Sequence, residues 1–290
     1  MSRRLALIVN PAAARGRALD SLPPALATLR SLGAEHRVVH ALGLSHARAQ
    51  AASAAARGET VVAVGGDGLV GALAGAVSEA GGTLAIVPAG RGNDFARVLD
   101  IPRASGAAAR LAAAGKPRTV DLGEVDGRAF VGIASVGIDS DVNRIAHQAR
   151  LVRGGLVYAY AGLRALAAWR HAHFKIVADG RRQRIRGYSV VVANSRAYGG
   201  GMIRVPHARL DDGRLDVLTI AAHPKLRFLR SFTRVFTGRP VRDSALRFTS
   251  AAEVGLHADR PFVVYADGEP IASLPATVRV RPGALRVIAP

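Results

Sequence analysis

The sequence predicts an α/β domain followed by a mostly β domain. Four short apolar runs in the first part of the chain each lead into an alanine-rich segment with helical spacing, which is typical of a parallel sheet covered by helices on both faces. In the later part, short alternating runs separated by Gly, Pro and Asp indicate antiparallel strands. This change in the pattern of apolar residues predicts two domains, over residues 1–120 and 121–290.

The individual elements follow from these patterns in order. In the first domain the expected strands are 5–10, 36–41, 60–66 and 83–90, and the expected helices are 20–32, 45–57, 68–80, 93–99 and 104–114. In the second domain we expect strands in 117–135 and 172–195, a helical block between them at 139–170, and short strands at 215–220, 245–250, 261–270, 276–282 and 284–289. Loops at the C-terminal ends of the parallel strands then form the edge where a ligand binds.

The composition indicates a globular, strongly basic protein. Of 290 residues, 49% are hydrophobic but only 5% are aromatic, so the core must consist of Ala, Val, Leu and Ile. The formal charge of +19 favours an anionic partner, such as nucleic acid, an anionic membrane surface or a phosphorylated substrate, although solvated arginines would give the same charge. Cysteine is absent, which excludes disulfides and cysteine-based zinc sites. No apolar run is long enough to span a bilayer, so we expect a cytoplasmic protein that at most rests on a membrane.

A glycine-rich turn at 65–71 follows the third expected strand. The letters GDGLVG match the dinucleotide-binding pattern G-x-G-x-x-G, but the next strand ends in Val-Pro-Ala-Gly, without the acidic residue that would bind a ribose. The sequence also lacks the G-x-x-x-x-G-K-[ST] phosphate loop and the protein-kinase motifs. Any phosphate must therefore be held by backbone N–H groups, arginines and a metal ion.

Three loops at strand ends, 10–16, 65–68 and 90–94, each precede an expected helix. The first N–H groups of a helix are unpaired and attract anions, so three adjacent helix starts predict a polyphosphate site. Asp67 lies inside the second loop, where its carboxylate would repel phosphate unless a divalent cation lies between them. We expect Mg²⁺ there; the alternative is a turn aspartate bonded to its own backbone.

Five segments, in order along the chain, carry a family resemblance. They are V-N-P at 9–11, V-G-G-D-G at 64–68, I-V-P-A-G-R-G-N-D-F-A-R at 86–97, L-D-D-G-R-L-D at 210–216 and A-D-G-E at 266–269. Together they resemble the diacylglycerol kinase catalytic-domain family, which includes bacterial lipid kinases and the related sphingosine and ceramide kinases. The resemblance implies a doubly wound nucleotide-binding domain of the NAD-kinase and phosphofructokinase type, then an antiparallel β-sandwich domain whose last residues could pack back on the first. It also implies ATP with Mg²⁺ in the cleft between the domains.

The resemblance further implies roles for single residues. Asp67 and Asp121 match active-site aspartates of the family, and Glu269 matches the general base that takes the proton from the lipid hydroxyl group. Nucleotide contacts are implied for Asn10, Gly65, Gly66, Asp67, Gly68, Leu69, Arg91 and Asn93. Asp67 is the implied magnesium ligand, and a second, structural metal is implied at the carbonyls of Arg209 and Arg214 and the carboxylate of Asp212. Without the resemblance, D-G-E and L-D-D-G-R-L-D would equally be turns between strands.

The sequence departs from the family pattern at the nucleotide loops. Leu69 stands where a threonine is usual, Gly71-Ala72 where Asn-Glu is usual, and Arg91 where a second threonine is expected. Two hydroxyl groups that would touch the nucleotide are therefore missing. We hypothesise that the Arg91 guanidinium replaces them with a charge-assisted contact to a phosphate.

The expected function is transfer of the γ-phosphate of ATP to the hydroxyl group of diacylglycerol or a related lipid in phospholipid metabolism. Two alternatives stay open: a soluble-substrate kinase of the NAD-kinase type, and a catalytically weakened homologue that binds nucleotide or membrane. The expected partner is a lipid substrate at an anionic membrane surface, and a homodimer is left open. We expect no nucleic-acid partner, because the sequence shows no helix-turn-helix, zinc finger or aromatic-studded RNA-binding strand.

Two amphipathic segments could contact a bilayer. Residues 223–238 place Leu and Phe at helical spacing with arginines on the opposite arc, which suits a helix on anionic lipid, although a helix packed on the β domain has the same pattern. Residues 156–174 place Tyr158, Tyr160 and Trp169 among apolar residues, and there core packing is the favoured interpretation.

Overall fold

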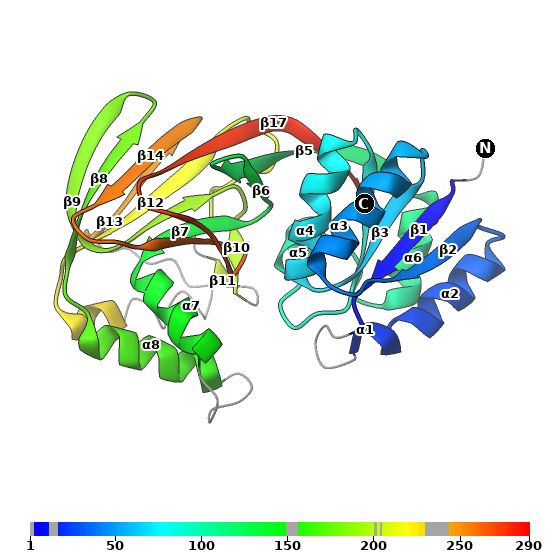
Figure 1. Ribbon diagram of the computed structural model, residues 1–290, viewed down its shortest axis with the longest axis horizontal. Coiled ribbons are helices and arrows are strands. Elements are labelled where there is room, and N and C mark those ends of the chain that lie inside the picture. Colours follow the sequence, from blue (N-terminus) through cyan, green and yellow to red (C-terminus); the bar gives the residue numbers. More distant parts are fainter. Residues whose placement is uncertain (1–2, 12–16, 149–155, 200–201, 204, 230–243) are drawn as a thin grey trace.

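The computed structural model describes residues 3–11, 17–148, 156–199, 202–203, 205–229 and 244–290. Two domains lie side by side, and one sheet continues from the first into the second (Figure 1). The first domain alternates strands and helices, and the second consists mostly of antiparallel strands. The fold class predicted from the sequence is therefore confirmed.

Four parallel strands form the centre of the first domain, in the order β2–β1–β3–β4. All residues of β1 and β3 are buried, which explains why the sequence runs are continuously apolar and do not alternate. Their carboxyl ends meet at one edge, where the predicted glycine loops follow. The strands are β1 (Leu5–Val9), β2 (His36–His40), β3 (Thr60–Gly65) and β4 (Thr83–Pro88).

Helices cover this sheet on both faces. α3 packs against α4 on one face, and α2 packs against α6 on the other (Figure 1). Alanines let the layers approach closely, and α3 buries Ala47, Ala51 and Ala54 against the sheet. The helices are α1 (Arg17–Asp20), α2 (Leu22–Ser31), α3 (Leu44–Ala56), α4 (Asp67–Glu79), α5 (Asp94–Val98) and α6 (Ser105–Ala114).

The second domain encloses its own core, which includes Trp169, Phe174 and Val192. Its strands are β5 (Lys116–Val125), β6 (Arg128–Phe130), β7 (Ile133–Gly137), β8 (Ala172–Ala178), β9 (Arg181–Ala193), β12 (Leu215–Ala221), β13 (Leu246–Ala251), β14 (Glu253–Ala258), β15 (Val263–Ala266), β16 (Glu269–Ser273) and β17 (Ala276–Ala289), with a separate pair β10 (Ala197–Tyr198) and β11 (Met202–Ile203). Two helices, α7 (Ile138–Gln148) and α8 (Leu156–Ala168), pack against each other, and α7 also contacts β7 and β15.

The long strand β17 joins the two domains. One end pairs antiparallel with β14, and the other end pairs parallel with β4, where Arg286 and Val287 lie opposite Thr83 and Leu84. β5 runs antiparallel to β17 along most of this length. Since β5 itself crosses residue 120 as one strand, the domain boundary at that residue stays a prediction.

The structure differs from the sequence analysis in several places. The expected strand 261–270 is two strands, β15 and β16, joined by a turn, and the pair β10–β11 was not expected. Residues 253–258 form β14, which was not expected, although Val254 and Leu256 alternate inward with exposed neighbours. The expected strands 276–282 and 284–289 are one strand with a register shift between Arg281 and Leu285. Core packing is confirmed for Trp169 but wrong for Tyr158 and Tyr160, which are 54% and 39% exposed because α8 lies on the outer side of α7.

The two segments considered for membrane contact have different outcomes. Residues 223–229 are described and become helical from residue 225, whereas the rest of the segment, 230–238, lies outside the described residues. Residues 156–168 form α8. Among the helices that the structure describes, none is long and apolar enough to cross a bilayer.

Candidate active site between the two domains

Two glycine loops meet at the C-terminal edge of the parallel sheet. β3 ends at Gly65 and β4 at Pro88, and the turns that follow bring Gly66 against Gly90. A Cβ atom on Gly90 would lie 2.4 Å from the Cα atom of Gly66, a distance that real side chains do not reach. Glycine at both positions therefore allows the loops to pack backbone against backbone.

Asn93 holds the second loop in shape. Its Oδ1 accepts the N–H of Gly90 at 2.8 Å, and its Nδ2 donates to the Gly90 carbonyl at 3.0 Å. Its φ of 52° lies in the left-handed region, which asparagine adopts more readily than most residues. Since both ends of the side-chain amide bond to the loop, the predicted contact between Asn93 and a nucleotide stays a prediction.

Asp67 is the first residue of α4, and its side chain links the glycine loop after β3 to the loop after β4. Its Oδ1 accepts the N–H groups of Asp94 at 2.6 Å and of Phe95 at 3.3 Å, at the start of α5. These partners belong to the neighbouring loop. Burial and the negative charge of Asp94 raise the pKa of the Asp67 carboxyl, although backbone N–H groups act in the opposite direction. Asp67 is therefore a half-buried carboxylate beside another carboxylate, with backbone N–H groups as its described partners.

Asp267 approaches the same place from the second domain. It begins the two-residue turn between β15 and β16, where its φ of 51° and the φ of 88° at Gly268 are the two positive angles of a type I′ hairpin. Its carboxylate accepts three successive N–H groups of residues 131–133, at 2.8, 2.9 and 3.3 Å. Burial raises the pKa of Asp267 to about 6, and the negative charge of Asp67 contributes to this shift. The carboxylates of the two domains are thus close enough to repel each other.

Gly71 explains this close approach. It lies four residues after Asp67 on α4, so the two residues share one face of the helix. A Cβ atom at Gly71 would lie 3.1 Å from Oδ2 of Asp267, which is tighter than an ordinary contact. The departure from the family pattern at Gly71 therefore makes room for the turn of the second domain against α4.

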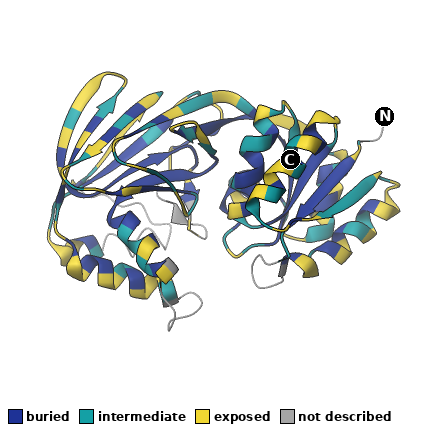
Figure 2. Cartoon of the chain, in the orientation of Figure 1, coloured by how far each residue is buried: buried dark blue, intermediate teal, exposed yellow. Residues whose placement is uncertain are grey.

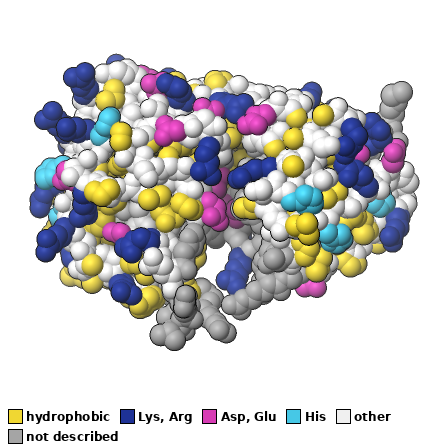
Figure 3. All heavy atoms as spheres, viewed as in Figure 1, with side chains coloured by type: hydrophobic (Ala, Val, Ile, Leu, Met, Phe, Trp, Pro, Cys, Tyr) yellow, Lys and Arg dark blue, Asp and Glu magenta, His cyan; other side chains and the backbone are white. Residues whose placement is uncertain are grey.

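A cavity of about 460 Å³ opens beside this contact. Its wall includes Gly68 of α4, part of α3, and the β15–β16 turn with Asp267 and Glu269. Glu269 is exposed, and its carboxylate makes no hydrogen bond or ion pair with any residue that the structure describes. Figure 3 shows acidic side chains gathered where the two domains meet. Glu269 and the loop that carries Asp67 therefore border the same cavity.

The other residues of the predicted nucleotide site lie around this edge. Leu69 is buried and packs under Gly65, so its side chain belongs to the core. Arg91 is exposed, and its guanidinium has no hydrogen-bond or ion-pair partner among the described residues. Asn10 follows β1 at the same edge and is half-buried, whereas residues 12–16 of its loop lie outside the described residues. The nucleotide contacts of these residues stay predictions.

Asp121 lies elsewhere, in β5. Its two carboxylate oxygens accept the N–H groups of Gly213 and Gly283, both at 2.7 Å, and its own N–H donates to the carbonyl of Leu210. Asp121 does not line the cavity that Glu269 borders. The structure thus brings Asp121 together with the loop at 209–214, and its catalytic role stays a prediction.

Ion pairs order the loop at 209–214. Asp211 pairs with Arg118 at 3.0 Å and with Arg209 at 3.2 Å. Desolvation acts to raise the pKa of Asp211, but the hydrogen bonds from these two arginines outweigh it and lower the pKa. Asp212 accepts the N–H of Arg214 at 3.1 Å, and the Arg214 guanidinium donates to Ser250 and to Asp179. Arginine side chains and backbone groups therefore supply the positive partners of this loop.

The two predicted metal sites differ in how well their residues fit a cation. The described residues contain no group of three or more His, Cys, Asp or Glu side chains arranged to hold one ion. Mg²⁺ needs no such group when one carboxylate and substrate phosphates hold it, and the raised pKa of Asp67 marks a carboxylate that lacks a cationic neighbour. At 209–214 the carboxylate of Asp212 and two backbone carbonyls would supply only part of an oxygen shell. Both metals stay predictions.

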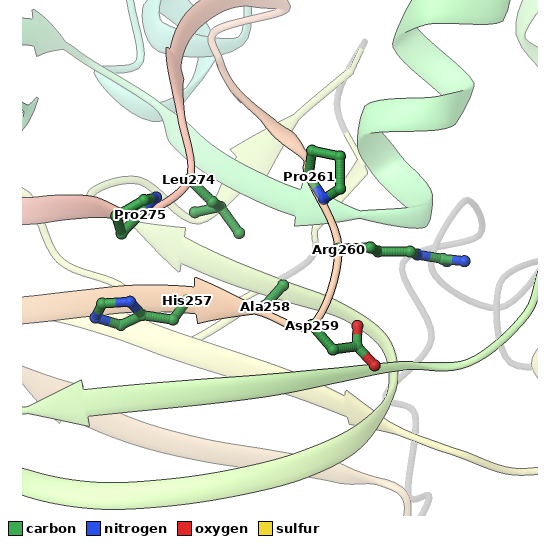
Figure 4. Close-up of a pocket in the computed structure, with 7 residues that line it drawn as sticks. All are labelled: His257, Ala258, Asp259, Arg260, Pro261, Leu274 and Pro275. Carbon is green, nitrogen blue, oxygen red and sulfur yellow. The ribbon is translucent and has the colours of Figure 1, made fainter.

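A second cavity, of about 290 Å³, lies at an outer end of the second domain. Figure 4 shows the residues that line it, from His257 to Pro261 together with Leu274 and Pro275. Arg260 points away from this cavity, and its guanidinium lies 4.8 Å from the centre of the Trp169 ring. None of the predicted site residues lines it, so we place the candidate active site at the interface between the domains.

Two residues of this interface were not identified from the sequence. Asp94 is 9% exposed and donates its N–H to Asp67, and Asp267 carries the most strongly raised carboxyl pKa of the site. The sequence signal for Asp94 was its place directly after Asn93, at a strand end. For Asp267 the D-G letters indicated only a turn, because its neighbours at 131–133 are far away in sequence.

Comparisons with known proteins agree with this arrangement. The model of the diacylglycerol kinase catalytic domain matches residues 4–125, and the model of the YegS C-terminal NAD kinase beta sandwich-like domain matches residues 132–289. A diacylglycerol kinase of Mycobacterium tuberculosis is 33% identical over 301 residues, covering 99% of this chain and 95% of that protein. A Pseudomonas aeruginosa protein named "probable lipid kinase YegS-like" is 34% identical over 234 residues, covering 80% of this chain and 76% of its own.

Solved structures show the same fold at lower identity. A diacylglycerol kinase from Bacillus anthracis superposes with a TM-score of 0.76 at 21% identity, covering all of this chain and 97% of that one. A further chain from that organism reaches a TM-score of 0.80 at 23% identity. These likenesses extend over both domains.

Proposed function

The chain belongs to the diacylglycerol kinase family, and we propose that it transfers the γ-phosphoryl group of ATP to the hydroxyl group of a lipid. Diacylglycerol is the proposed acceptor, since two kinds of relative carry the names diacylglycerol kinase and lipid kinase. Mg²⁺ bound with the nucleotide is the proposed cofactor. The matches give no support to the alternative of a soluble-substrate kinase.

One observation carries the proposal: Glu269 of the second domain and the glycine loop of Asp67 border one cavity. Phosphoryl transfer requires mainly positioning and neutralisation of charge, with one base for the proton of the attacking hydroxyl group. The cavity has the proposed base, Glu269, on the second domain and the glycine loop, through Gly68, on the first. A lipid headgroup that enters it would meet the carboxylate from one side and the nucleotide loops from the other.

Glu269 is the proposed base. Its carboxylate has no hydrogen-bond or ion-pair partner among the described residues, so it is available to accept a proton. The turn that carries it is fixed, because Asp267 bonds to the backbone of residues 131–133. Asp267 thus acts as a positioning residue for Glu269.

Asp67 is the proposed ligand of Mg²⁺. Bound there together with ATP, the ion would neutralise negative charge on the phosphates, and ATP would supply the transferable phosphoryl group. Asp67 stays oriented because the N–H groups of Asp94 and Phe95 hold its Oδ1. Arg48 and Arg128 also line the cavity and add positive charge near the phosphates. Arg91 contributes a further guanidinium at the loop edge.

The proposal is tested by incubating the protein with radiolabelled ATP, Mg²⁺ and a panel of acceptors: diacylglycerol, monoacylglycerol, sphingosine and ceramide in mixed micelles, and NAD in solution. We expect label in phosphatidic acid. Asp67→Asn and Glu269→Gln should lower the rate of transfer by about a hundredfold or more, while Glu35→Gln, which changes a carboxylate away from the cavity, should leave it unchanged. Label in NAD alone, or equal transfer by all three variants, would refute the proposal.

The substrate implies where the protein works. Diacylglycerol is embedded in a bilayer, so we propose a cytoplasmic protein that associates peripherally with an anionic membrane. The formal charge of +19 supports this attraction. Fractionation of cells at low and high salt tests it, since electrostatic association should weaken as ionic strength rises.

A further inference from the structure

α8 is apolar around almost its entire circumference. Its sequence, LVYAYAGLRALAA, contains a single charged residue, Arg164, and no acidic residue. A helix of this composition is normally enclosed by a core or by lipid. Here only the side formed by Ala161, Ala165 and Leu166 is buried against the domain.

The opposite side of α8 is exposed. We call it the α8 face; it consists of Ala159, Tyr160, Leu163, Arg164 and Ala167. Tyr160 is 39% exposed and Leu163 is 57% exposed, and Figure 2 shows exposed residues recurring along the helix. Contiguous exposed apolar surface can mark a site of contact with a membrane or another protein.

The neighbouring chain segment extends this surface. Nζ of Lys225 donates to the carbonyl of Ala167 at 2.7 Å, which fixes residue 225 at the end of α8. The next residue, Leu226, is 63% exposed. A segment that is distant in sequence thus adds an exposed leucine, next to Lys225 in the chain, near the C-terminal end of α8.

Positive charge surrounds the apolar residues. Arg164 donates to the hydroxyl group of Tyr160 at 3.0 Å, and Arg170 is exposed just beyond α8. β8 begins two residues after Arg170, and along it Lys175 lies directly opposite Arg184 of β9, although like charges facing each other destabilise a sheet. Lys and Arg side chains line the edge of the molecule where β8 and β9 lie (Figure 3). This surface combines exposed tyrosine and leucine with cations.

We propose that the α8 face, together with Leu226, docks on the surface of an anionic bilayer. Tyrosine, leucine and arginine on one helix face are the composition that interfacial helices use, with apolar groups in the acyl boundary and cations at the headgroups. A second copy of the chain is the less suitable occupant, because two surfaces of the same positive sign repel each other. This inference rests on the proposed function, which brings the protein to a lipid.

The docking would bring the active site to its substrate. α8 packs on α7, and α7 packs on β15, the strand that leads to Asp267 and Glu269. Packed helices lie about 8–10 Å apart. A bilayer under α8 is therefore separated by one helix layer from β15, the strand that leads to the proposed base.

Vesicle flotation of the full chain tests the docking directly. Vesicles of phosphatidylglycerol and phosphatidylcholine are compared with phosphatidylcholine alone, without nucleotide. Tyr160→Ser/Leu163→Ser should lower the partition coefficient on anionic vesicles by about tenfold or more, since it removes apolar groups of this size from lipid. Leu42→Ser is the matched control, because Leu42 is 92% exposed on the first domain and should not change binding.

The outcomes separate docking from catalysis. The double variant should keep its kcat on a short-chain diacylglycerol dissolved in water, which also shows that it is folded. Equal flotation of the double variant and the wild type would overturn the docking proposal even if the protein is a kinase. A concentration-dependent dimer that the double variant loses, without vesicle binding by the wild type, would also overturn it.

Discussion

Two groups of carboxylates in this protein differ in what surrounds them. At the interface between the domains, burial raises the pKa values of Asp67 and Asp267, and each carboxylate has a second one nearby. In the loop at 209–214, arginines lower the pKa of Asp211, and two backbone N–H groups bond to Asp121. The first group has excess negative charge, whereas the second is neutralised by its own surroundings.

We interpret this difference as one between a functional site at the interface and a structural role for the carboxylates around the loop at 209–214. Two half-buried carboxylates close to each other cost stability unless a positive group lies near them, which supports the proposed Mg²⁺. The carboxylates of the loop stabilise the native structure without a ligand. The resemblance assigned Asp67 and Asp121 to one active site, but the structure gives them different surroundings.

Glu269→Gln should have the largest effect and tests the interface group. If Glu269 takes the proton of the acceptor, its neutral replacement lowers kcat by about 10²–10⁴, the usual contribution of a general base. Nucleotide affinity should change little, because Glu269 does not belong to the glycine loops. Steady-state kinetics with nucleotide binding by calorimetry provide the two values. A variant with normal kcat would remove Glu269 from the mechanism.

Asp121→Ala tests the loop group. It leaves the N–H groups of Gly213 and Gly283 without their acceptor, and two charge-assisted hydrogen bonds together contribute about 4 kcal/mol. We expect a loss of this size in the free energy of unfolding, measured with urea, and much smaller losses for Asp20→Ala at the surface. If Asp121→Ala is instead fully stable but inactive, Asp121 belongs with the active-site group and the comparison is wrong.

The pH dependence of stability should have opposite signs in the two groups. The folded protein holds the pKa of Asp267 at about 6, above its ordinary value, so it favours the protonated form. The stability from this group is present below about pH 4 and is lost as pH rises through 6, by about 3 kcal/mol. For Asp211 the pKa is lowered, so its contribution is present at neutral pH and is lost on acidification.

Asp267→Asn and Asp211→Asn make this measurable. Urea unfolding of each variant and of the wild type is followed from pH 2 to pH 7. Relative to Asp267→Asn, the wild type should lose about 3 kcal/mol as pH rises between about pH 4 and pH 7. Relative to Asp211→Asn, the wild type should keep a constant advantage above about pH 4 and lose it as pH falls below 4. Parallel curves for all three proteins would show that the two carboxylates do not differ in this way.

The sequence predicted the architecture better than the contacts. Strand and helix order followed from local apolar patterns, which is why the four parallel strands and their helices were expected at nearly the right residues. β14 was missed because it is short, with Gly255 in its centre and a polar residue at its start. The exposure of α8 could not be predicted, since an apolar helix has the same sequence pattern in a core and on a surface.

The candidate site was predictable only in part. Asp67 and Glu269 stood out through motifs, and the structure places the loop of one and the side chain of the other on one cavity. Asp267 did not stand out, because its role depends on N–H groups at 131–133 and on the space left at Gly71. Such contacts join segments more than 60 residues apart and leave no local signal in the sequence.

Arg91→Ala should have the smallest effect of these variants. It tests a positively charged side chain near the interface, where the other variants test carboxylates. Arg91 is exposed without a described partner, so the folded protein gains little from it and unfolding should be unchanged. A guanidinium that replaces the missing hydroxyl groups would contribute about 1 kcal/mol to phosphate binding at this exposed position, which corresponds to a five- to tenfold rise in the KM for ATP. Arg110→Ala, an exposed arginine on α6, should leave that KM unchanged. An unchanged KM in Arg91→Ala would mean that the glycine loops hold the nucleotide without this side chain.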